Sequence, residues 1–257
     1  MIRSFVTWNR RLAQRFSRRF PQFCASPSYR AELQERVELA LREGATAVLE
    51  TGGIDRPLLR KGAGFLYDGL DIEDRPACHE IYDHFWVQSV EQPIPARYDL
   101  IMSMTLLEHV PSNQASSRAM ADSLVQGGST HHYIPGAYHP YAVLTRLVGP
   151  KLQKRLIGVL RPQAVHLTGY PAYFDHCTPR SMARLFRGAG LVDIECRPFY
   201  RANDYFAFFF PLFLMLTAFE NLCRRLDWSI FASGFVISAR KPLEVGQADQ
   251  HRAGGTA

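Results

Sequence analysis

The sequence predicts an α/β protein built on one mostly parallel β-sheet with helices on both faces. Short apolar runs alternate with helix-compatible segments along most of the chain, which is the order of successive βα units. The run Ala47–Glu50 stays apolar until its final acid, as a strand buried on both faces does. Gly52 and Gly53 follow and supply the turn that leads out of such a strand. These observations predict the first βα unit of the sheet.

A second apolar run, Phe65–Leu70, completes this unit and ends at Asp71. Between the two runs, Pro57 predicts the start of a short helix. Ligands of parallel sheets bind beyond the carboxyl ends of the strands, where Glu50, the glycine turn and Asp71 are expected to lie together. An acid about twenty residues after a glycine turn is well placed to accept hydrogen bonds from ribose hydroxyls. The opening unit therefore predicts a cofactor that carries a nucleoside.

The later elements continue this alternation. A helix is expected over Arg30–Arg42, because Gly44 follows it at the position of a C-cap glycine. Further strands are expected at Phe85–Val87, Tyr98–Ser103, Thr130–Ile134, Val192–Phe199 and Ile230–Ala239. Further helices are expected at Leu106–Val110, at Ser116–Val125, and from the N-cap Thr178 to Gly188 or Gly190. The chain thus carries the strands of one large sheet.

Length, charge and cysteine content limit the classes of protein to which this chain can belong. A chain of 257 residues is ordinary for one α/β domain with appendages. Its net charge of +6 is concentrated at the start, since Met1–Arg30 carries seven arginines and no acid. The remainder is close to neutral, so we expect no nucleic-acid partner. Five scattered cysteines without a CxxC pair indicate a reducing, cytoplasmic compartment and argue against disulfide or metal scaffolds.

Residues 1–44 form a basic and helical N-terminal region ahead of the sheet. Within 1–23, apolar residues recur near helical spacing between arginines, namely Ile2, Phe5, Leu12, Phe16 and Phe20. Such a helix fits a membrane interface and equally fits docking on the protein's own body, and both interpretations stay open. No signal peptide is evident, because an uninterrupted apolar core and a cleavage site are missing, whereas an organellar transit peptide remains an alternative.

Two insertions interrupt the alternation. The first, 136–176, is longer than an ordinary connection and predicts a lid or a substrate pocket. The second, 200–228, contains Tyr205–Thr217, a run of thirteen residues without a charge. A membrane span needs roughly twenty residues, and Pro211 breaks the run, so we expect it to be buried, to line a pocket or to lie at an interface. The polar tail 243–257 is expected to be flexible.

Several motifs follow the opening unit in a fixed order. Tyr98–Ser103 is followed by Leu107–Pro111, with the letters LEHVP, and the last strand continues into Arg240–Pro242. Between them lie the glycine pair Gly127-Gly128 before a strand and Gly188–Leu191 at the end of a helix. Over about 45–242, the chain resembles class I S-adenosylmethionine-dependent methyltransferases, including their type 11-like domains. The resemblance implies a Rossmann-like, seven-stranded sheet and S-adenosyl-L-methionine as the cofactor.

The resemblance also assigns residues to that cofactor. They are, in chain order, Glu50, Gly52, Gly53, Asp71, Ile72, Ser89, Val90 and Met104. The first three would meet the methionine end of the cofactor, and Asp71 would meet its ribose hydroxyls. The next three would lie beside the adenine, although the acid that the family often has there is missing. The backbone of Met104 would lie near the sulfonium.

The glycine loop departs from the family pattern E-x-G-x-G-x-G. Ile54 and Arg56 stand where the second and third glycines are usual. A β-branched residue is poorly suited to positive φ, so either the loop takes a different path through Gly53 or it binds the cofactor weakly. Arg56 also makes a nicotinamide enzyme a weaker alternative.

His109 is the histidine that the resemblance places near the methyl group of the cofactor. A histidine side chain can take a proton from an acceptor hydroxyl, while a packing role is an equally open interpretation. The expected activity is methyl transfer to a small, hydrophobic, lipid-linked or glycan-linked acceptor, with peripheral membrane contact through 1–23 or 205–217. A non-catalytic, methyltransferase-like binding protein is the alternative.

Overall fold

The computed structural model describes residues 2–25, 27–54, 56–62, 64–148 and 170–243. Within them, seven strands form one sheet in the order β3-β2-β1-β4-β5-β7-β6. The strands are β1 (Ala47–Thr51), β2 (Leu66–Asp71), β3 (Phe85–Val87), β4 (Tyr98–Met104), β5 (Leu124–Pro135), β6 (Val192–Phe199) and β7 (Gly234–Arg240). Strands β1 to β5 pair in parallel, and β7 is antiparallel to β5 and β6. The predicted seven-stranded, mostly parallel sheet is confirmed.

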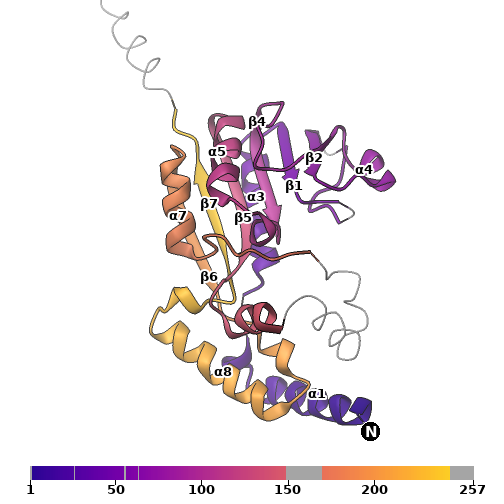
Figure 1. The fold of residues 1–257 in the computed structure, drawn as a ribbon, viewed down its shortest axis with the longest axis vertical. Helices are drawn as coiled ribbons and strands as arrows, with labels where there is room; N and C mark the ends of the chain where they lie inside the picture. The colour runs from indigo at the N-terminus through magenta and orange to yellow at the C-terminus, as the bar shows by residue number, and fades with distance from the viewer. Residues whose placement is uncertain (1, 26, 55, 63, 149–169, 244–257) are drawn as a thin grey trace, which may run out of the picture.

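The central strands are buried on both faces, as their unbroken apolar runs predict. Successive side chains of a strand point to opposite faces. In β4, Leu100 and Met102 pack on one face with α3 (Tyr29–Arg42). Ile101 packs on the other face with α5 (Asn113–Ser123) and α7 (Pro179–Gly188). Helices therefore cover both faces of the sheet (Figure 1).

Two helix starts follow the sequence signals for capping. The hydroxyl of Thr178 accepts a hydrogen bond from the amide of Ser181 at 3.3 Å, with Pro179 in the first turn of α7. The hydroxyl of Ser28 accepts one from the amide of Ala31 at 3.3 Å and begins α3. Each bond satisfies an amide that has no partner inside the helix. These local signals fix where the covering helices begin.

Several local predictions differ from the structure. The strand expected over Ile230–Ala239 begins only at Gly234, because Ser229–Phe231 form a 3₁₀ turn. The short helix expected after Pro57 does not form, and the described residues from 56 to 65 make turns and bends; the amide of Leu58 bonds to Glu50 instead. The helix α4 (Pro76–Ile81) was not predicted. The helix expected to reach Val125 ends at Ser123, because β5 already begins before the glycine pair and shifts its register on β4 there.

A helical foot lies beyond the sheet. We use this name for α1 (Ile2–Arg19), α2 (Pro21–Cys24), the 3₁₀ turn η3 (Asn203–Phe206) and α8 (Phe210–Arg225). Ala13 of α1, Cys24 of α2 and Phe213 of α8 share a small buried core. Pro211 stands in the first turn of α8, where its missing amide costs nothing, so it begins the helix and does not break it. One face of α1 thus docks on the protein's own body (Figure 1).

A buried hydrogen bond joins the foot to the sheet. His139, just beyond β5, lies 3.1 Å from Glu220 of α8, and both side chains are buried. The same carboxylate oxygen accepts a hydrogen bond from the amide of Ala202 after β6. A helix over 140–148 follows His139. Of the predicted lid and tail, 149–169 and 244–257 lie outside the described residues, and no described helix is both long and apolar enough to cross a bilayer.

Candidate functional site

The register of the sheet brings the predicted site residues to one edge. Thr51 at the end of β1 pairs with Leu70 of β2 and with Ser103 of β4. Glu50, Asp71 and Met104 therefore stand on three adjacent strands at their carboxyl ends. This is the edge where ligands of parallel sheets bind.

Asp71 ends β2 and keeps its carboxylate at this edge. Its Oδ1 accepts a hydrogen bond from the amide of Glu73 at 2.9 Å, which holds the side chain in a tight turn. Burial raises the pKa of Asp71. The neighbouring Ile72 has an unusually exposed apolar side chain, 67% exposed. The pair offers a hydrogen-bond acceptor beside an open apolar surface, which suits a ribose and the flat face of a base.

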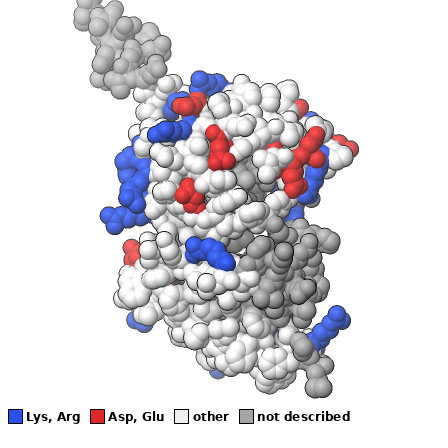
Figure 2. All heavy atoms as spheres, viewed as in Figure 1, with Lys and Arg blue, Asp and Glu red and all other residues white. Residues whose placement is uncertain are grey.

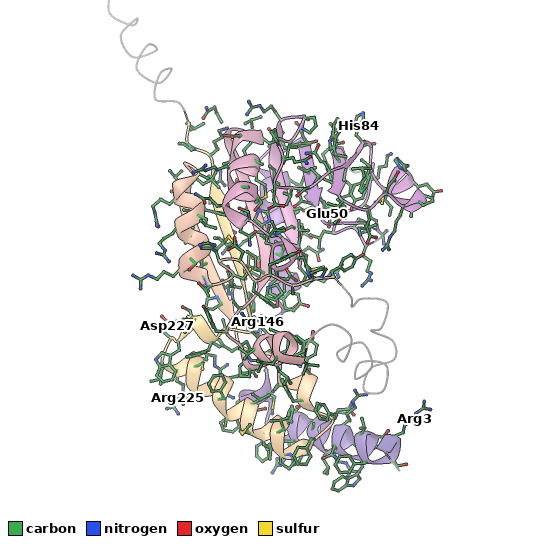
Figure 3. All side chains as sticks on the ribbon, viewed as in Figure 1. Arg3, Glu50, His84, Arg146, Arg225 and Asp227 are labelled. Carbon is green, nitrogen blue, oxygen red and sulfur yellow. The ribbon has the colours of Figure 1, made fainter. Side chains whose placement is uncertain are left out.

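Glu50 is turned into the protein interior, at the place that Figure 3 labels. Its Oε2 accepts hydrogen bonds from the hydroxyls of Tyr67 and Tyr82 and, at 3.1 Å, from the amide of Leu58. Burial raises its pKa to about 7. The predicted contact between this carboxylate and the ammonium group of a ligand is not what this geometry favours. Glu50 instead braces the loop after β1 from inside.

The two predicted glycines are required by contacts within the protein. Gly52 has φ +80°, and a Cβ on it would lie 2.9 Å from the Cβ of Leu106. A Cβ on Gly53 would lie 2.4 Å from the hydroxyl of Tyr82, which itself donates to the carbonyl of Gly53. The loop is therefore packed against Leu106, two residues after β4, on one side and against Glu50 and Tyr82 on the other.

Ile54, which replaces a family glycine, does not enter the crevice. Its side chain packs on the apolar core on the α3 face, and its carbonyl accepts a hydrogen bond from the thiol of Cys78 at 3.2 Å. It is absent from the described residues with positive φ, so the loop takes a path that a β-branched residue tolerates. Within this loop Gly52 is the residue at positive φ and Gly53 is not, so the turn does not depend on Gly53 in the expected way.

Ser89 and Val90 follow β3, where the sequence lacks the expected acid. Val90 is buried in the core, and the hydroxyl of Ser89 donates to Glu91 at 3.0 Å. Glu91 also accepts a hydrogen bond from the amide of Ser112, the N-cap of α5, at 2.8 Å. Glu91 is thus an acid near this position that sequence reasoning missed, although its carboxylate is engaged in holding the loop to α5.

The chain leaves β4 through strained backbone. Met104 is partly buried against the apolar core, and Thr105 follows it with φ 60°. This left-handed conformation costs a β-branched residue roughly 1–2 kcal/mol. The Thr105 amide donates to the carbonyl of Tyr133 at 3.1 Å, which holds the turn in place. Strain of this kind concentrates at functional sites, where the surrounding structure fixes it.

His109 and Glu108 form the next turn, η1 (Leu107–His109). The Nδ1 of His109 lies 2.8 Å from the carbonyl of Pro171, and its Nε2 lies 3.7 Å from Oε1 of Glu108. The other oxygen of Glu108 is buried and has no hydrogen-bond partner among the described residues. Burial raises the pKa of Glu108 to about 8. Sequence reasoning selected His109 from the LEHVP motif and missed Glu108, which the same motif contains.

A strap of residues 170–177 crosses this edge. The amides of Tyr173 and Phe174 donate to the carbonyl of Glu108 at 2.9 and 3.0 Å. At its start, the hydroxyl of Tyr170 donates to Glu73 after β2 at 2.5 Å, and its ring lies edge-on to His109 at 5.9 Å. The strap therefore connects the Asp71 side of the edge to the His109 side.

The described residues offer no cluster of three or more side chains that would hold a metal ion. The remaining histidines near β5 are part of the core. His132 lies 2.7 Å from the hydroxyl of Ser103, and burial lowers its pKa to about 3. His131 is buried beside Ser238, with a pKa lowered to about 3 by burial. Neither faces the crevice as a free base.

Comparison with known proteins finds solved structures with a similar fold. No protein-family model and no curated protein matches the sequence. A SAM dependent methyltransferase from Archaeoglobus fulgidus has a similar structure, with a TM-score of 0.51, 12% identity and coverage of 88% of this chain and 98% of that one.

Two further solved structures are more distant. The N-methyltransferase NodS from Bradyrhizobium japonicum has a TM-score of 0.46 and 14% identity over 83% of this chain and 96% of that one. Phosphoethanolamine N-methyltransferase 2 from Haemonchus contortus has a TM-score of 0.48 and 13% identity over 81% of this chain, which spans 52% of that one. With the strand order and the Archaeoglobus similarity together, the chain has the class I S-adenosylmethionine-dependent methyltransferase fold.

Proposed function

We propose that this protein is an S-adenosylmethionine-dependent methyltransferase whose acceptor is a small, hydrophobic, lipid-linked or glycan-linked molecule. The observation that carries the proposal is Asp71 at the end of β2, with exposed Ile72 beside it, in a sheet of this fold. The Archaeoglobus protein with the similar structure is described as SAM dependent, which supports the same cofactor here.

The residues at the edge fit the nucleoside end of this cofactor better than its methionine end. Asp71 would accept the ribose hydroxyls, and Ile72 would cover the adenine together with the segment at Ser89 and Val90. At the other end, Glu50 is engaged with two tyrosines, so the backbone of Gly52 and Gly53 would have to meet the carboxylate and ammonium. The backbone at Met104 borders the same crevice. The cofactor, when bound, supplies an activated methyl group on a sulfonium.

His109 is the proposed base. A carbonyl oxygen only accepts hydrogen bonds, so the 2.8 Å contact with Pro171 places a proton on Nδ1 of the neutral ring. Its Nε2 then carries the lone pair and can take a proton from an acceptor hydroxyl or amine. The ring remains accessible, with 33% of the side chain exposed. The strap fixes its orientation through the carbonyl of Pro171 and the ring of Tyr170.

Aromatic side chains between the sheet and the helical foot support a hydrophobic acceptor. Tyr29 of α3 stacks on Tyr133 of β5 at 3.8 Å, and Tyr141 stacks on Tyr205 at 4.1 Å. Tyr133 lies near the carboxyl end of β5, and Tyr141 follows that strand by six residues. Stacked rings of this kind offer apolar faces with polar hydroxyl ends, which suit a hydrophobic acceptor with a polar head.

Calorimetric titration of the folded protein with S-adenosylmethionine tests the cofactor. We expect binding that Asp71→Ala weakens by about tenfold to a hundredfold, because hydrogen bonds to a charged group are lost. Asp74→Ala is the matched control, since this exposed acid lies three residues away and pairs with the exposed His79. Absence of binding by the intact protein at millimolar cofactor would remove the proposal.

A non-catalytic, methyltransferase-like binding protein is the second candidate. It is favoured by the inward Glu50 and by Leu106, which stands against Gly52 in the crevice. Incubation of the protein and a lipid extract with methyl-labelled S-adenosylmethionine separates the two candidates. Label transferred to any component eliminates the second candidate, provided that His109→Ala reduces the transfer; cofactor binding without transfer to any extract favours it.

A further inference from the structure

Helix α1 has two flanks with different surroundings. Its inner side docks on α8 through Ala13 and Phe16, and Asn9 accepts a hydrogen bond from the amide of Phe210 at 2.9 Å. A hollow of about 440 Å³ lies along one flank, between α1 residues such as Gln14 and Ser17 and the η3 region at Asp204. That flank therefore faces the body of the protein.

The opposite flank of α1 is aromatic and open to solvent. Phe5 and Trp8 are 52% and 59% exposed, and they are three residues apart on the same side of the helix. Arg11 and Arg15 follow Trp8 at spacings of three and seven residues, so they border the same side. Large exposed aromatics beside arginines are uncommon on a free protein surface.

Helix α8 continues this apolar surface. Its buried side, with Phe213, Glu220 and Cys223, packs toward the body. Its outer side carries Pro211, Met215, Ala218 and Leu222, at spacings of four, seven and eleven residues. Met215 is 61% exposed and Leu222 is 48% exposed, and no charged side chain interrupts the helix between them except the buried Glu220.

The exposed side of α1 adjoins the start of α8. Phe5 of α1 stacks on Phe209, just ahead of α8, with 6.4 Å between the ring centroids. Farther along, the amide group of Asn221 donates to the carbonyl of Phe23 in α2 at 2.8 Å. We call the surface formed by Phe5, Trp8, Phe23, Phe209, Met215 and Leu222 the outer face of the foot. Figure 2 shows mostly uncharged atoms over the end of the molecule where Figure 1 places α8 and α1.

The charge around the outer face indicates what covers it. Helix α1 carries six arginines and no acid, and Arg224 and Arg225 end α8. Figure 3 shows Arg3 and Arg225 at opposite ends of the foot, so positive charge borders the face at both ends. Exposed Trp and Phe between arginines are typical of helices that lie in a membrane interface, where the arginines attract anionic lipid.

We propose that the outer face of the foot binds the surface of a membrane that contains anionic phospholipids. The aromatic and apolar side chains insert among the acyl chains near the head groups. The arginines contact lipid phosphates. This inference rests on the foot and does not depend on methyl transfer, so the cofactor experiments and the membrane experiment can fail separately. Both interpretations of the N-terminal helix then hold at once, since one face docks and the other meets lipid.

Flotation with lipid vesicles tests this proposal on the full chain. We expect the protein to float with vesicles of phosphatidylglycerol and phosphatidylcholine mixed at roughly three to seven, a ratio that gives the vesicle surface a moderate negative charge. It should bind pure phosphatidylcholine far more weakly. Trp8→Ser should weaken the apparent affinity on the order of tenfold, because the interfacial side chain is lost. Leu243→Ser is the control, since Leu243 is 73% exposed but follows β7, far from the foot in the fold.

Charge reversal tests the arginines separately. Arg11→Glu with Arg15→Glu should reduce binding on the order of a thousandfold, because four units of charge change at the lipid surface. Arg184→Glu with Arg187→Glu makes the same change in net charge on α7, beside the sheet, and should change binding much less. Raised salt should weaken the binding of the wild-type protein.

Several results would overturn the proposal. Failure of the wild-type protein to float with anionic vesicles is one, and equal losses for the α1 and α7 charge variants is another. A third is a stable dimer in solution that Trp8→Ser converts to monomer, because a second copy would then cover the outer face. Acyl-brominated lipid provides an independent check, since it should quench the emission of the wild-type protein more than that of Trp8→Phe.

Discussion

The carboxyl edge of the sheet buries its acidic side chains, whereas the outer face of the foot exposes apolar side chains and arginines. At the edge, Glu50 and Glu108 are buried and their pKa values are raised by burial. At the outer face, aromatic side chains and arginines stand in solvent. The edge therefore depends on close internal contacts, whereas the outer face can change without disturbing the fold. Substitutions at the edge should alter stability as well as binding, and those at the outer face should alter binding alone.

The largest effect is expected at the loop after β1. Gly53→Ala would place a Cβ 2.5 Å from Cδ of Glu50 and still closer to Tyr82, both of which are buried. We expect the free energy of unfolding to fall by about 4 kcal/mol, since overpacking here also breaks a buried hydrogen-bond network. Gly188→Ala is the control, because a Cβ there meets nothing within 4 Å. Denaturant titration measures both variants, and equal stability of the two would show that the edge is not tightly packed.

A smaller effect is expected where the foot joins the sheet. Glu220→Ala leaves His139 and the amide of Ala202 without their buried acceptor. Leaving these buried polar groups without a partner should cost about 3 kcal/mol. Thermal unfolding followed by circular dichroism measures the loss, and Glu38→Ala on the exposed side of α3 provides the control. Unchanged stability of Glu220→Ala would show that the foot is joined mainly by apolar contacts.

The pH dependence of stability tests the buried acid beside His109. The pKa of Glu108 is about 8 in the folded protein against an ordinary 4.5, so its contribution is full below 4.5 and is lost as pH rises through about 8. Glu50 acts in the same direction, with a folded pKa of about 7. His131 and His132 have folded pKa values near 3, below the ordinary histidine pKa of 6.5, so they lower stability only when the pH falls below about 6.5.

Between about pH 6 and 8.5, the wild-type protein should therefore lose stability, and Glu108→Gln should remove about 2 kcal/mol of that loss. Denaturant titrations at both pH values measure the difference. The substitution Glu38→Gln, at an exposed position, should leave the change of unfolding free energy with pH unaltered. A wild-type stability that rises over this range would contradict the burial of Glu108 as an acid.

The smallest effect on stability is expected at the outer face. Met215→Ser should change the free energy of unfolding by less than about 0.5 kcal/mol, because the side chain is 61% exposed. Phe213→Ala, two residues earlier on the buried side of the same helix, should cost about 3 to 5 kcal/mol. Thermal unfolding compares the two. A large loss for Met215→Ser would show that the outer face is part of the core.

The sequence predicts which strands and turns form the site better than it predicts the side-chain contacts within it. The run Ala47–Glu50, the glycines after it and the acid Asp71 are local signals, and the parallel sheet brings them together at one edge. The partners of Glu50 are not local, since Tyr67 and Tyr82 lie 17 and 32 residues away along the chain. No periodicity indicates that two tyrosines would turn an acid away from the ligand side.

In the foot, too, the sequence predicts the segments but not the contacts between them. The charge-free run that begins at Tyr205 is evident in the sequence, and so is the basic helix before residue 23. Their pairing is not, because Asn9 and Phe210 are 201 residues apart. Only the fold shows that one side of each helix is used internally, and that Pro211 starts a helix and does not end one.

This separation also sets the order in which the parts form. A ribosome adds roughly 5 to 20 residues per second, so α8 emerges on the order of 10 to 40 seconds after α1. During that interval the docking side of α1, with Ala13 and Phe16, lacks its partner Phe213 of α8 and has only the nearby Phe20 and Cys24 to pack against. The nascent helix is then apolar on two sides and basic on the rest, and the later arrival of α8 determines which of the two apolar sides becomes buried.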